Sequence, residues 1–296
     1  MYNKDLLKKT LADNAALTET ALESWLSEAY SGDTVLAESM RYAVLGGGKR
    51  IRAFLAIEFC RLFGGKPEAA LPYASAIEMV HAYSLVHDDM PCMDNDDMRR
   101  GKPSCHCAFG EANALLCGDT LLTQAFEVAL LNPHVSDRSR VLAARTLAGG
   151  AGALGMTGGQ YYDLSDECGT YDELVRLQSM KTGALIRTAC LLGYYAACDT
   201  PKAEDEARIA RYAEEIGFAF QIVDDLLDVR SDTATLGKPV GSDAKNGKKT
   251  ILTFRTIEEA EKLAAECTAD AIDAVSAYEG CEILTDLAEY LLTRTK

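Results

Sequence analysis

The segment 207–229, ARIARYAEEIGFAFQIVDDLLDV, decides the fold class of this chain. Its apolar residues recur at positions i, i+3, i+4 and i+7, which is the spacing of one face of an α-helix. The segment 6–26, LLKKTLADNAALTETALESWL, has the same period. Strand-like alternation of apolar and polar residues is hard to find, and the seven prolines are expected in or beside breaks between helices. We therefore predict an all-α bundle of roughly ten or more helices, built as a single domain over residues 1–296.

The composition is that of an ordinary globular chain and excludes several classes of function. The 296 residues are 48% hydrophobic and 25% charged, and 30 Lys and Arg stand against 45 Asp and Glu, a net charge of −15. This balance argues against a nucleic-acid partner, because phosphate binding needs a basic surface. The longest uncharged apolar run, between Arg187 and Asp199, is far shorter than the ~20 residues of a membrane span. Ten scattered cysteines without a secretory signal lead us to expect a cytoplasmic protein with reduced thiols.

Two short patterns imitate known sites. The stretch 150–155, GAGALG, has the glycine spacing of a dinucleotide-binding loop, but no strand precedes it. We interpret its glycines as small residues that let helices pack closely. The stretch Cys105-His106-Cys107 is too tightly spaced for the usual zinc pair, and no second Cys/His pair follows it. We expect a packed or surface cysteine pair there.

Two acidic clusters stand apart from the general surface charge. They are HDDMPCMDNDD (87–97) and VDDLLDV (223–229), and each lies at the end of a strongly apolar helical segment. A solvated acidic face would instead alternate with Lys and Arg along the helix. Carboxylates this close repel one another unless a cation lies between them. Since Mg²⁺ favours sites made of a few carboxylates, water and phosphate oxygens, we predict Mg²⁺ as the cofactor.

The spacing within each cluster supports a shared ion. Asp224 and Asp228 are four residues apart and therefore share one face of a helix. Asp88 and Asp94 are six residues apart and would diverge on a straight helix. Because Pro91 breaks the helix between them, Asp94 can fold back toward Asp88.

Basic residues lie close to the first cluster in sequence. Lys49, Arg50 and Arg52 follow a triple glycine, and Arg99 and Arg100 come directly after the acidic residues. In a chain of this net charge, such local clusters of basic residues indicate an anionic ligand. Mg²⁺ on one side and Arg or Lys on the other make a site for a diphosphate. The apolar residues between these motifs predict that the ligand carries a hydrocarbon tail.

Seven ordered blocks resemble the trans-isoprenyl diphosphate synthases, and specifically their bacterial-type, short-chain members. The blocks are GGGKRIR (46–52), EMVHAYSLVHDDMPCMDNDDMRRGKPSCH (78–106), FGEANALLCGD (109–119), GGQYYDL (158–164), KTGALI (181–186), FQIVDDLLDV (220–229) and TLGKPVGSDAKNGKKT (235–250). The resemblance covers nearly the whole chain. It implies long helices around a deep cavity, usually in a homodimer, with the two acidic motifs facing each other across its mouth. It also implies that isopentenyl diphosphate is condensed with dimethylallyl or geranyl diphosphate.

The same resemblance implies roles for individual residues. Mg²⁺ would be held by Asp88, Asp94 and Asp224, with support from Asp89, Asp225 and Asp228. The allylic diphosphate would be contacted by Arg99, Lys181, Thr182, Gln221 and Lys238, and isopentenyl diphosphate by Lys49, Arg52, His81 and Arg100. Lys181 and Lys238 would stabilise the charge that builds on the leaving diphosphate. No protein nucleophile is needed, because the double bond of isopentenyl diphosphate attacks the allyl cation.

The helix before the first cluster is expected to set the length of the product. Tyr83 lies five residues before Asp88, or about 7–8 Å along the helix axis, and Ser84 lies one turn away. In this family a bulky aromatic at that position looks like a stop after fifteen carbons, whereas smaller residues go with twenty. We therefore expect farnesyl diphosphate as the product, with geranylgeranyl diphosphate as the alternative.

Two other functions share some of these features. A class I terpene cyclase also uses an Asp-rich helix, but it normally carries an Asn/Ser/Glu second motif, whereas this chain has DDLLD followed by Gly237-Lys238. A non-catalytic subunit of a heteromeric prenyltransferase typically lacks one Asp motif. Here both motifs are intact, which favours an active synthase.

Overall fold

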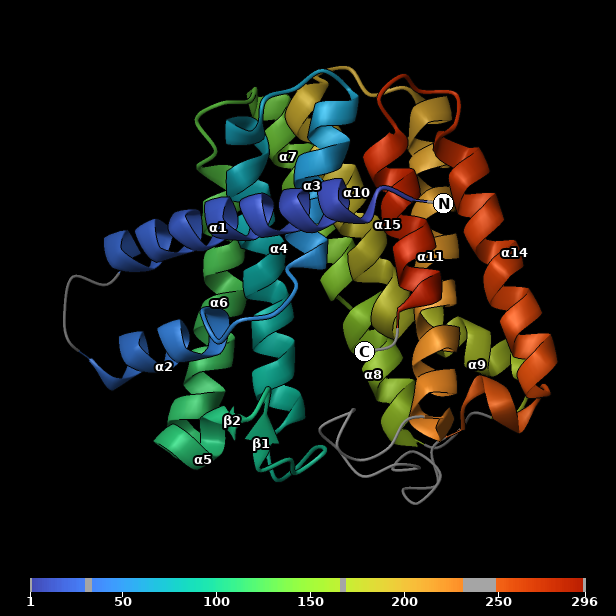
Figure 1. The fold of residues 1–296 in the computed structure, drawn as a ribbon. Coiled ribbons are helices and arrows are strands. Elements are labelled where there is room, and N and C mark those ends of the chain that lie inside the picture. The colour runs from blue at the N-terminus through green and yellow to red at the C-terminus, as the bar shows by residue number, and fades with distance from the viewer. Residues whose placement is uncertain (1, 30–33, 166–168, 231–248, 295–296) are drawn as a thin grey trace. The chain divides into compact units, whose positions relative to one another are not determined.

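The computed structural model of the chain describes residues 2–29, 34–165, 169–230 and 249–294. Within these ranges the chain is almost entirely helical, so the prediction of an all-α protein is confirmed (Figure 1). The helices are α1 (Lys4–Ala29), α2 (Val35–Val44), α3 (Ile51–Leu62), α4 (Pro67–Asp88), α5 (Cys105–Phe109), α6 (Glu111–Leu130), α7 (Asp137–Ala151), α8 (Met156–Ser165), α9 (Tyr171–Gln178), the π-helix η1 (Ser179–Gly183), α10 (Ala184–Ala197), α11 (Ala203–Arg230), the 3₁₀ helix η2 (Ile251–Thr253), α14 (Ile257–Val275) and α15 (Glu282–Thr293). Two short antiparallel strands, β1 (Met98–Arg99) and β2 (Lys102–Pro103), pair Met98 with Pro103.

The chain divides into two compact units. The N-terminal unit comprises Lys8–Ala148 and Thr188–Pro201, and the C-terminal unit comprises Met1–Leu7, Gly149–Arg187 and Lys202–Lys296. A single domain over residues 1–296 stays a prediction. None of the helices in the described ranges is both long and apolar enough to cross a membrane.

Helix α4 forms the centre of the N-terminal unit. It packs against α3 and α6. Its side chains are buried on every side, among them Tyr73, Ile77 and Val80, none of which has any exposed surface. A helix that is apolar all round belongs inside a core, which explains why this one holds its position firmly. The last residue of α4 is Asp88, so the first acidic cluster begins at the end of this core helix.

Pro72 lies inside α4, so the expectation that all seven prolines fall in or beside helix breaks is wrong at this position. Proline removes the hydrogen bond that an amide at position 72 would donate to the carbonyl of Glu68. The helix persists because the surrounding turns are buried, and tertiary packing supplies most of the stability of helices in proteins.

The last turn of α4 is held by α6. The imidazole of His87 lies 3.1 Å from the carbonyl oxygen of Leu115 through its Nε2 atom. A Cβ atom added at Gly118 would overlap the same ring, so glycine is what allows the ring to approach. This contact fixes the helix end from which the first acidic cluster starts.

The C-terminal unit is built around α11, which packs against α14 and α15. A core cluster joins Ile222 and Leu226 of α11 to Ile251 of η2 and to Ala260 and Ala264 of α14. Helix α11 runs without interruption through the second acidic cluster. That cluster therefore keeps helical spacing, with some of its aspartates turned toward the core.

The glycines of residues 150–155 lie at a helix-to-helix turn. Helix α7 ends at Ala151 and α8 begins at Met156, and a Cβ added at Gly155 would overlap the carbonyl of Gly150. These glycines therefore permit a tight turn between consecutive helices. At Gly155 this agrees with the expectation that small residues let helices pack closely, here the end of α7 and the start of α8.

Candidate active site

The first acidic cluster folds back on itself as the helix break predicts. After α4 ends at Asp88, the amide of Asp94 donates to the carbonyl of Asp88 at 2.8 Å. The amide of Asp96 donates to the carbonyl of Asp89 at 3.2 Å, and Asn95 adopts a left-handed backbone with φ of 52°. The residues Asp88 and Asp94 are thus linked through the backbone. Non-glycine residues with positive φ are uncommon and mark a tightly constrained loop.

Asp89, which is buried, pairs in this loop with the partly exposed Arg99. The Nε atom of Arg99 lies 3.0 and 3.1 Å from the two carboxylate oxygens of Asp89, and its Nη2 atom contacts the same carboxylate. Asp89 is only 2% exposed, and burial raises its pKa while the Arg99 guanidinium opposes that shift. The hydrogen bond to Asp89 raises the pKa of Arg99. Asp89 orients the Arg99 side chain. The contact of Arg99 with a diphosphate stays a prediction.

A cluster of guanidinium groups lies at the start of α3. Arg50 has a left-handed backbone with φ of 49°, and its side chain donates to the carbonyl of Val44 at 2.6 Å and to Glu78 at 3.1 Å. Burial lowers the pKa of Arg52, Arg100 lowers it further, and Glu78 raises it. The guanidinium of Arg100 donates to the carbonyl of Gly47. The cations here outnumber the single buried carboxylate, which makes this surface receptive to an anion.

His81 belongs to the same cluster. Burial and the nearby guanidinium groups of Arg52 and Arg100 lower its pKa well below the ordinary value of 6.5. The ring is therefore neutral at pH 7 and can donate or accept a hydrogen bond without adding charge. The Nε atom of Arg52 is buried and has no hydrogen-bond partner among the described residues. The structure thus brings together Arg52, His81 and Arg100, three of the four residues expected to bind isopentenyl diphosphate. The fourth, Lys49, is exposed.

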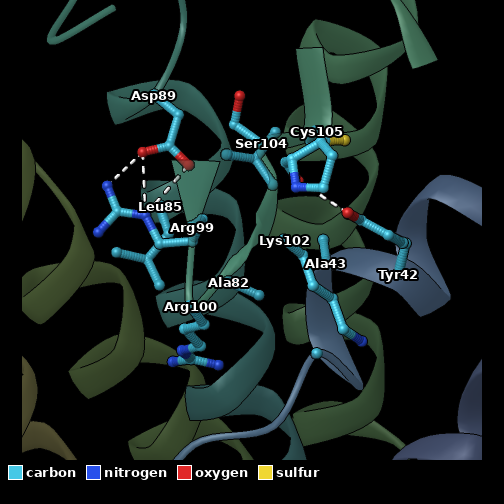
Figure 2. Close-up of a pocket in the computed structure, with 13 residues that line it drawn as sticks. Tyr42, Ala43, Ala82, Leu85, Asp89, Arg99, Arg100, Lys102, Ser104 and Cys105 are labelled. Atoms are coloured by element: carbon cyan, nitrogen blue, oxygen red, sulfur yellow. Dashed lines mark hydrogen bonds and ion pairs between the residues drawn. The ribbon is translucent and has the colours of Figure 1, made fainter. Parts of the chain in front are cut away.

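A surface hollow opens beside this cluster. Figure 2 shows Asp89 and Arg99 joined on one wall and Tyr42 and Lys102 on the other. The hydroxyl of Tyr42 donates to the carbonyl of Pro103 at 2.7 Å, which holds α2 to the β hairpin. The hollow therefore belongs to the N-terminal unit alone.

The second acidic cluster places its aspartates in different surroundings. Asp225 and Asp228 are 4% and 5% exposed. Asp225 accepts the amide of Ile251 at 2.8 Å and the side-chain amide of Gln221 at 3.1 Å. Asp225 therefore holds η2 in place, and its expected support of the Mg²⁺ ligands stays a prediction. Gln221 is engaged by Asp225, so its predicted contact with the allylic diphosphate stays a prediction.

Asp224 is paired with an arginine that the sequence analysis missed. Arg294 lies 2.6 Å from a carboxylate oxygen of Asp224, and it also donates to the carbonyl of Phe220 at 3.0 Å. Its guanidinium stacks over the Phe220 ring at 3.9 Å. Because 70 residues separate the two partners, no local pattern could have revealed the pair.

Lys181 lies in η1, the π-helix between α9 and α10. Its ammonium group lies 2.6 Å from Asp163, and a Cβ added at Gly159 would overlap the backbone of Lys181. Thr182 follows it and is partly buried. π-Helical turns occur frequently at functional sites.

The block GGQYYDL adds two further candidate site residues, Asp163 and Gln160. The side-chain amide of Gln160 is buried and has no hydrogen-bond partner among the described residues. Lys238 lies outside the described residues.

The two residues expected to set product length lie on α4. Tyr83 is 7% exposed, and its ring meets that of His87 edge-on with centroids 5.8 Å apart. The hydroxyl of Ser84 donates to the carbonyl of His81 at 2.9 Å. Their influence on the product stays a prediction.

Comparison with known proteins identifies the family. The model of the polyprenyl synthetase family matches residues 33–280. The chain is 42% identical over 285 residues to the farnesyl diphosphate synthase of Escherichia coli, covering 93% of this chain and 95% of the relative. It is 41% identical over 266 residues to the geranylgeranyl diphosphate synthase of Cyanophora paradoxa, covering 88% of each. A solved structure of an FPP/GFPP synthase from Zymomonas mobilis matches with a TM-score of 0.84 at 37% identity, covering 97% of this chain and 99% of that one. The chain belongs to the polyprenyl synthetase family.

Proposed function

We propose that this chain is a short-chain trans-prenyltransferase that condenses isopentenyl diphosphate with dimethylallyl or geranyl diphosphate to give farnesyl diphosphate. One observation carries the proposal. The loop that links Asp88 to Asp94 continues directly into Arg99 and Arg100, which join the guanidinium cluster at α3. Carboxylates for a hard cation and guanidinium groups for a diphosphate thus share one surface. The relative from Escherichia coli, which carries the name farnesyl diphosphate synthase, supports the choice of product.

The carboxylates fit Mg²⁺, and we propose that Asp88 and Asp94 hold it in the N-terminal unit and Asp224 in the C-terminal unit. The backbone hydrogen bond from Asp94 to Asp88 brings two hard oxygen donors onto one loop. Mg²⁺ is commonly held by one or two carboxylates and completed by water and substrate phosphates. When bound, it would neutralise the negative charge that develops on the departing diphosphate.

The guanidinium cluster is proposed to hold the diphosphate of isopentenyl diphosphate. Burial and neighbouring guanidinium groups lower the pKa values of Arg52 and Arg100, so their charged forms are less favourable here than in water. A bound diphosphate relieves both penalties at once and accepts charge-assisted hydrogen bonds. Neutral His81 adds a hydrogen bond, and exposed Lys49 adds a flexible positive charge.

The allylic diphosphate is proposed to contact Lys181, Thr182, Gln221, Arg99 and Lys238. Its C–O bond breaks, and the bonding electrons leave with the diphosphate. The double bond of isopentenyl diphosphate then forms the new C–C bond, and a proton is lost to the departing diphosphate. The ammonium group of Lys181 is already oriented by Asp163, so it can stabilise the leaving oxygens without reorganisation.

Product length, assembly and location complete the proposal. Tyr83, with Ser84 beside it, is proposed to limit the chain to fifteen carbons; twenty carbons is the alternative. A homodimer is supported by Leu115 and Leu116 of α6, which are 46% and 53% exposed.

A cytoplasmic location is supported by the nine described cysteines, all free thiols and five of them buried. We propose that the two units act as one domain.

A product assay tests the proposal. Purified protein is incubated with isopentenyl and dimethylallyl diphosphate, either with Mg²⁺ or with a chelator, and the hydrolysed products are separated by chromatography. We expect a fifteen-carbon alcohol that forms only when Mg²⁺ is present. A twenty-carbon alcohol would favour the geranylgeranyl alternative. The absence of any condensation would contradict the proposal and favour a non-catalytic subunit.

A further inference from the structure

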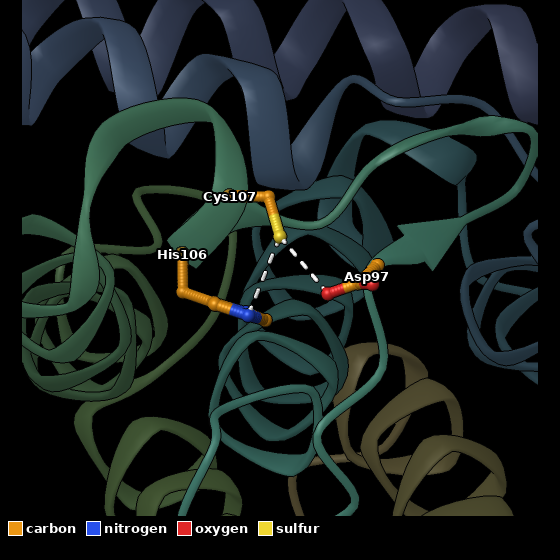
Figure 3. A group of neighbouring side chains, drawn as sticks. All are labelled: Asp97, His106 and Cys107. Carbon is orange, nitrogen blue, oxygen red and sulfur yellow. Dashed lines mark hydrogen bonds between the residues drawn. The ribbon is translucent and has the colours of Figure 1, made fainter.

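Three side chains of types that bind metals meet at the end of the first acidic cluster. Asp97, His106 and Cys107 place one donor atom each within 4.8 Å of the others (Figure 3). The Cys107 sulfur lies 3.4 Å from Nε2 of His106 and 3.5 Å from a carboxylate oxygen of Asp97. Cys105, the other cysteine of the Cys-His-Cys stretch, is buried away from solvent, so the two cysteines do not form a pair.

The spacing of these atoms fits a tetrahedral ion. Zinc binds cysteine sulfur at about 2.3 Å and histidine nitrogen or carboxylate oxygen at about 2.0–2.2 Å. With tetrahedral angles, the sulfur would then lie about 3.5–3.6 Å from each of the other two donors. The observed separations are 3.4 and 3.5 Å. Two of the three donor separations therefore match a tetrahedral site, and the third pair, Asp97 and His106, lies within 4.8 Å.

The surrounding residues hold these ligands in place. The Nδ1 atom of His106 lies 3.0 Å from the hydroxyl of Ser104, a residue that is 1% exposed. In the tautomer in which Nδ1 donates to this hydroxyl, the lone pair is left on Nε2, the atom that faces Cys107. The amide of Ser104 donates to the carbonyl of Asp97 at 2.8 Å, which ties both ends of the β hairpin together. Asp97 is thus held beside Ser104, which precedes His106 and Cys107 by two and three residues.

We propose that Asp97, His106 and Cys107 form a binding site for a thiophilic divalent transition metal, with Zn²⁺ as the best fit and a fourth position open to water. Thiolate and imidazole ligands select such ions over Mg²⁺, which prefers oxygen donors. Binding replaces the proton of the Cys107 thiol, which now faces Asp97, and releases it to solvent. The site shares none of its three residues with those proposed to bind Mg²⁺ or the two diphosphates.

Cobalt absorption tests the site in the reduced, metal-free, full-length protein. Co²⁺ bound to a thiolate gives a charge-transfer band in the near ultraviolet, which the carboxylate motifs cannot give. We expect the band in the unaltered protein and in Cys92→Ser, whose cysteine is also exposed and lies before the hairpin. We expect it to vanish in Cys107→Ser. A band that persists in Cys107→Ser, or no band in the unaltered protein, would overturn the proposal.

Two further measurements separate a metal site from a merely structural contact. Zn²⁺ should slow alkylation of Cys107 in the unaltered protein but not that of Cys92, as followed by mass spectrometry. Ser104→Ala should keep the cobalt band but weaken Co²⁺ binding by about 10- to 100-fold, because it removes the hydrogen bond that orients His106. Equal alkylation of both cysteines with and without Zn²⁺ would also contradict the site.

Discussion

The two acidic clusters contain similar residues but differ in how the backbone presents them. The first begins where α4 ends, so its aspartates lie on a folded-back loop, and Asp94 is exposed. The second lies within α11, where helical spacing turns Asp225 and Asp228 into the core and leaves Asp224 partly exposed. A helix end and a helix interior thus give the same residue type two different sets of neighbours.

This difference separates the proposed ligands from the proposed supports within each cluster. Asp89 is buried against Arg99, and Asp225 is buried against the amide of Ile251, so each is occupied by a structural partner. Asp88, Asp94 and Asp224 are more exposed and remain as candidates for Mg²⁺. Asp224 also contacts Arg294, which would have to share that carboxylate with the ion. The comparison predicts unequal effects when members of one cluster are changed.

The largest effect is expected at the proposed ligands. Asp88→Ala or Asp224→Ala should each lower kcat by about 1000-fold or more, because each removes charge stabilisation of the leaving diphosphate. Steady-state assays measure the loss, and circular dichroism should show unchanged helicity. Asp13→Ala, which alters an exposed aspartate of α1, serves as the matched control and should keep full activity. Near-normal turnover in either test variant would contradict the assignment of its cluster.

The next largest effect is expected on the KM values, which should respond differently for the two substrates. Arg52→Ala and Arg100→Ala should raise the KM for isopentenyl diphosphate by about 10- to 100-fold, which corresponds to the loss of one charge-assisted hydrogen bond. The KM for geranyl diphosphate should change less. Lys181→Ala should show the opposite preference. Initial rates with each substrate varied in turn measure both constants, and equal changes for the two substrates would argue against separate subsites.

A smaller effect concerns stability. Asp225→Ala leaves the buried amide of Ile251 without its acceptor and should lower the free energy of unfolding by about 1–3 kcal/mol. Urea denaturation followed by circular dichroism measures the change, again with Asp13→Ala as control. Its loss of kcat should be smaller than that of Asp224→Ala. If instead Asp225→Ala is fully stable and as inactive as Asp224→Ala, Asp225 is a ligand and the division into ligands and supports fails.

The smallest effect on rate is expected at Tyr83. Tyr83→Ala removes a buried ring one turn before His87 and should shift the product toward twenty carbons or more, with little change in the rate of the first condensation. Ser84→Ala, a neighbouring change of small volume, is the control. Chromatography of the hydrolysed products decides the matter. An unchanged fifteen-carbon product from Tyr83→Ala would show that another side chain limits the chain.

The helices and the acidic motifs could be predicted from the sequence because their signals are local. Apolar periodicity marks α11, and Pro91 after a run of aspartates marks the end of α4. Contacts between distant residues could not be predicted in this way. Arg294 reaches Asp224 across 70 residues, and a hairpin brings Asp97 to Cys107. The position of Pro72 inside a helix could not be predicted either, because it depends on the burial of α4, which local sequence rules do not include.

The proposed function requires that both acidic clusters act on the same leaving diphosphate. A double-mutant cycle on single-turnover rates, with Asp88→Ala, Asp224→Ala and the double variant, tests it most directly. Residues that act as one unit show strongly non-additive losses. We predict that the double variant is little slower than the slower single variant. Losses that multiply would show that the two clusters act independently and would contradict the claim.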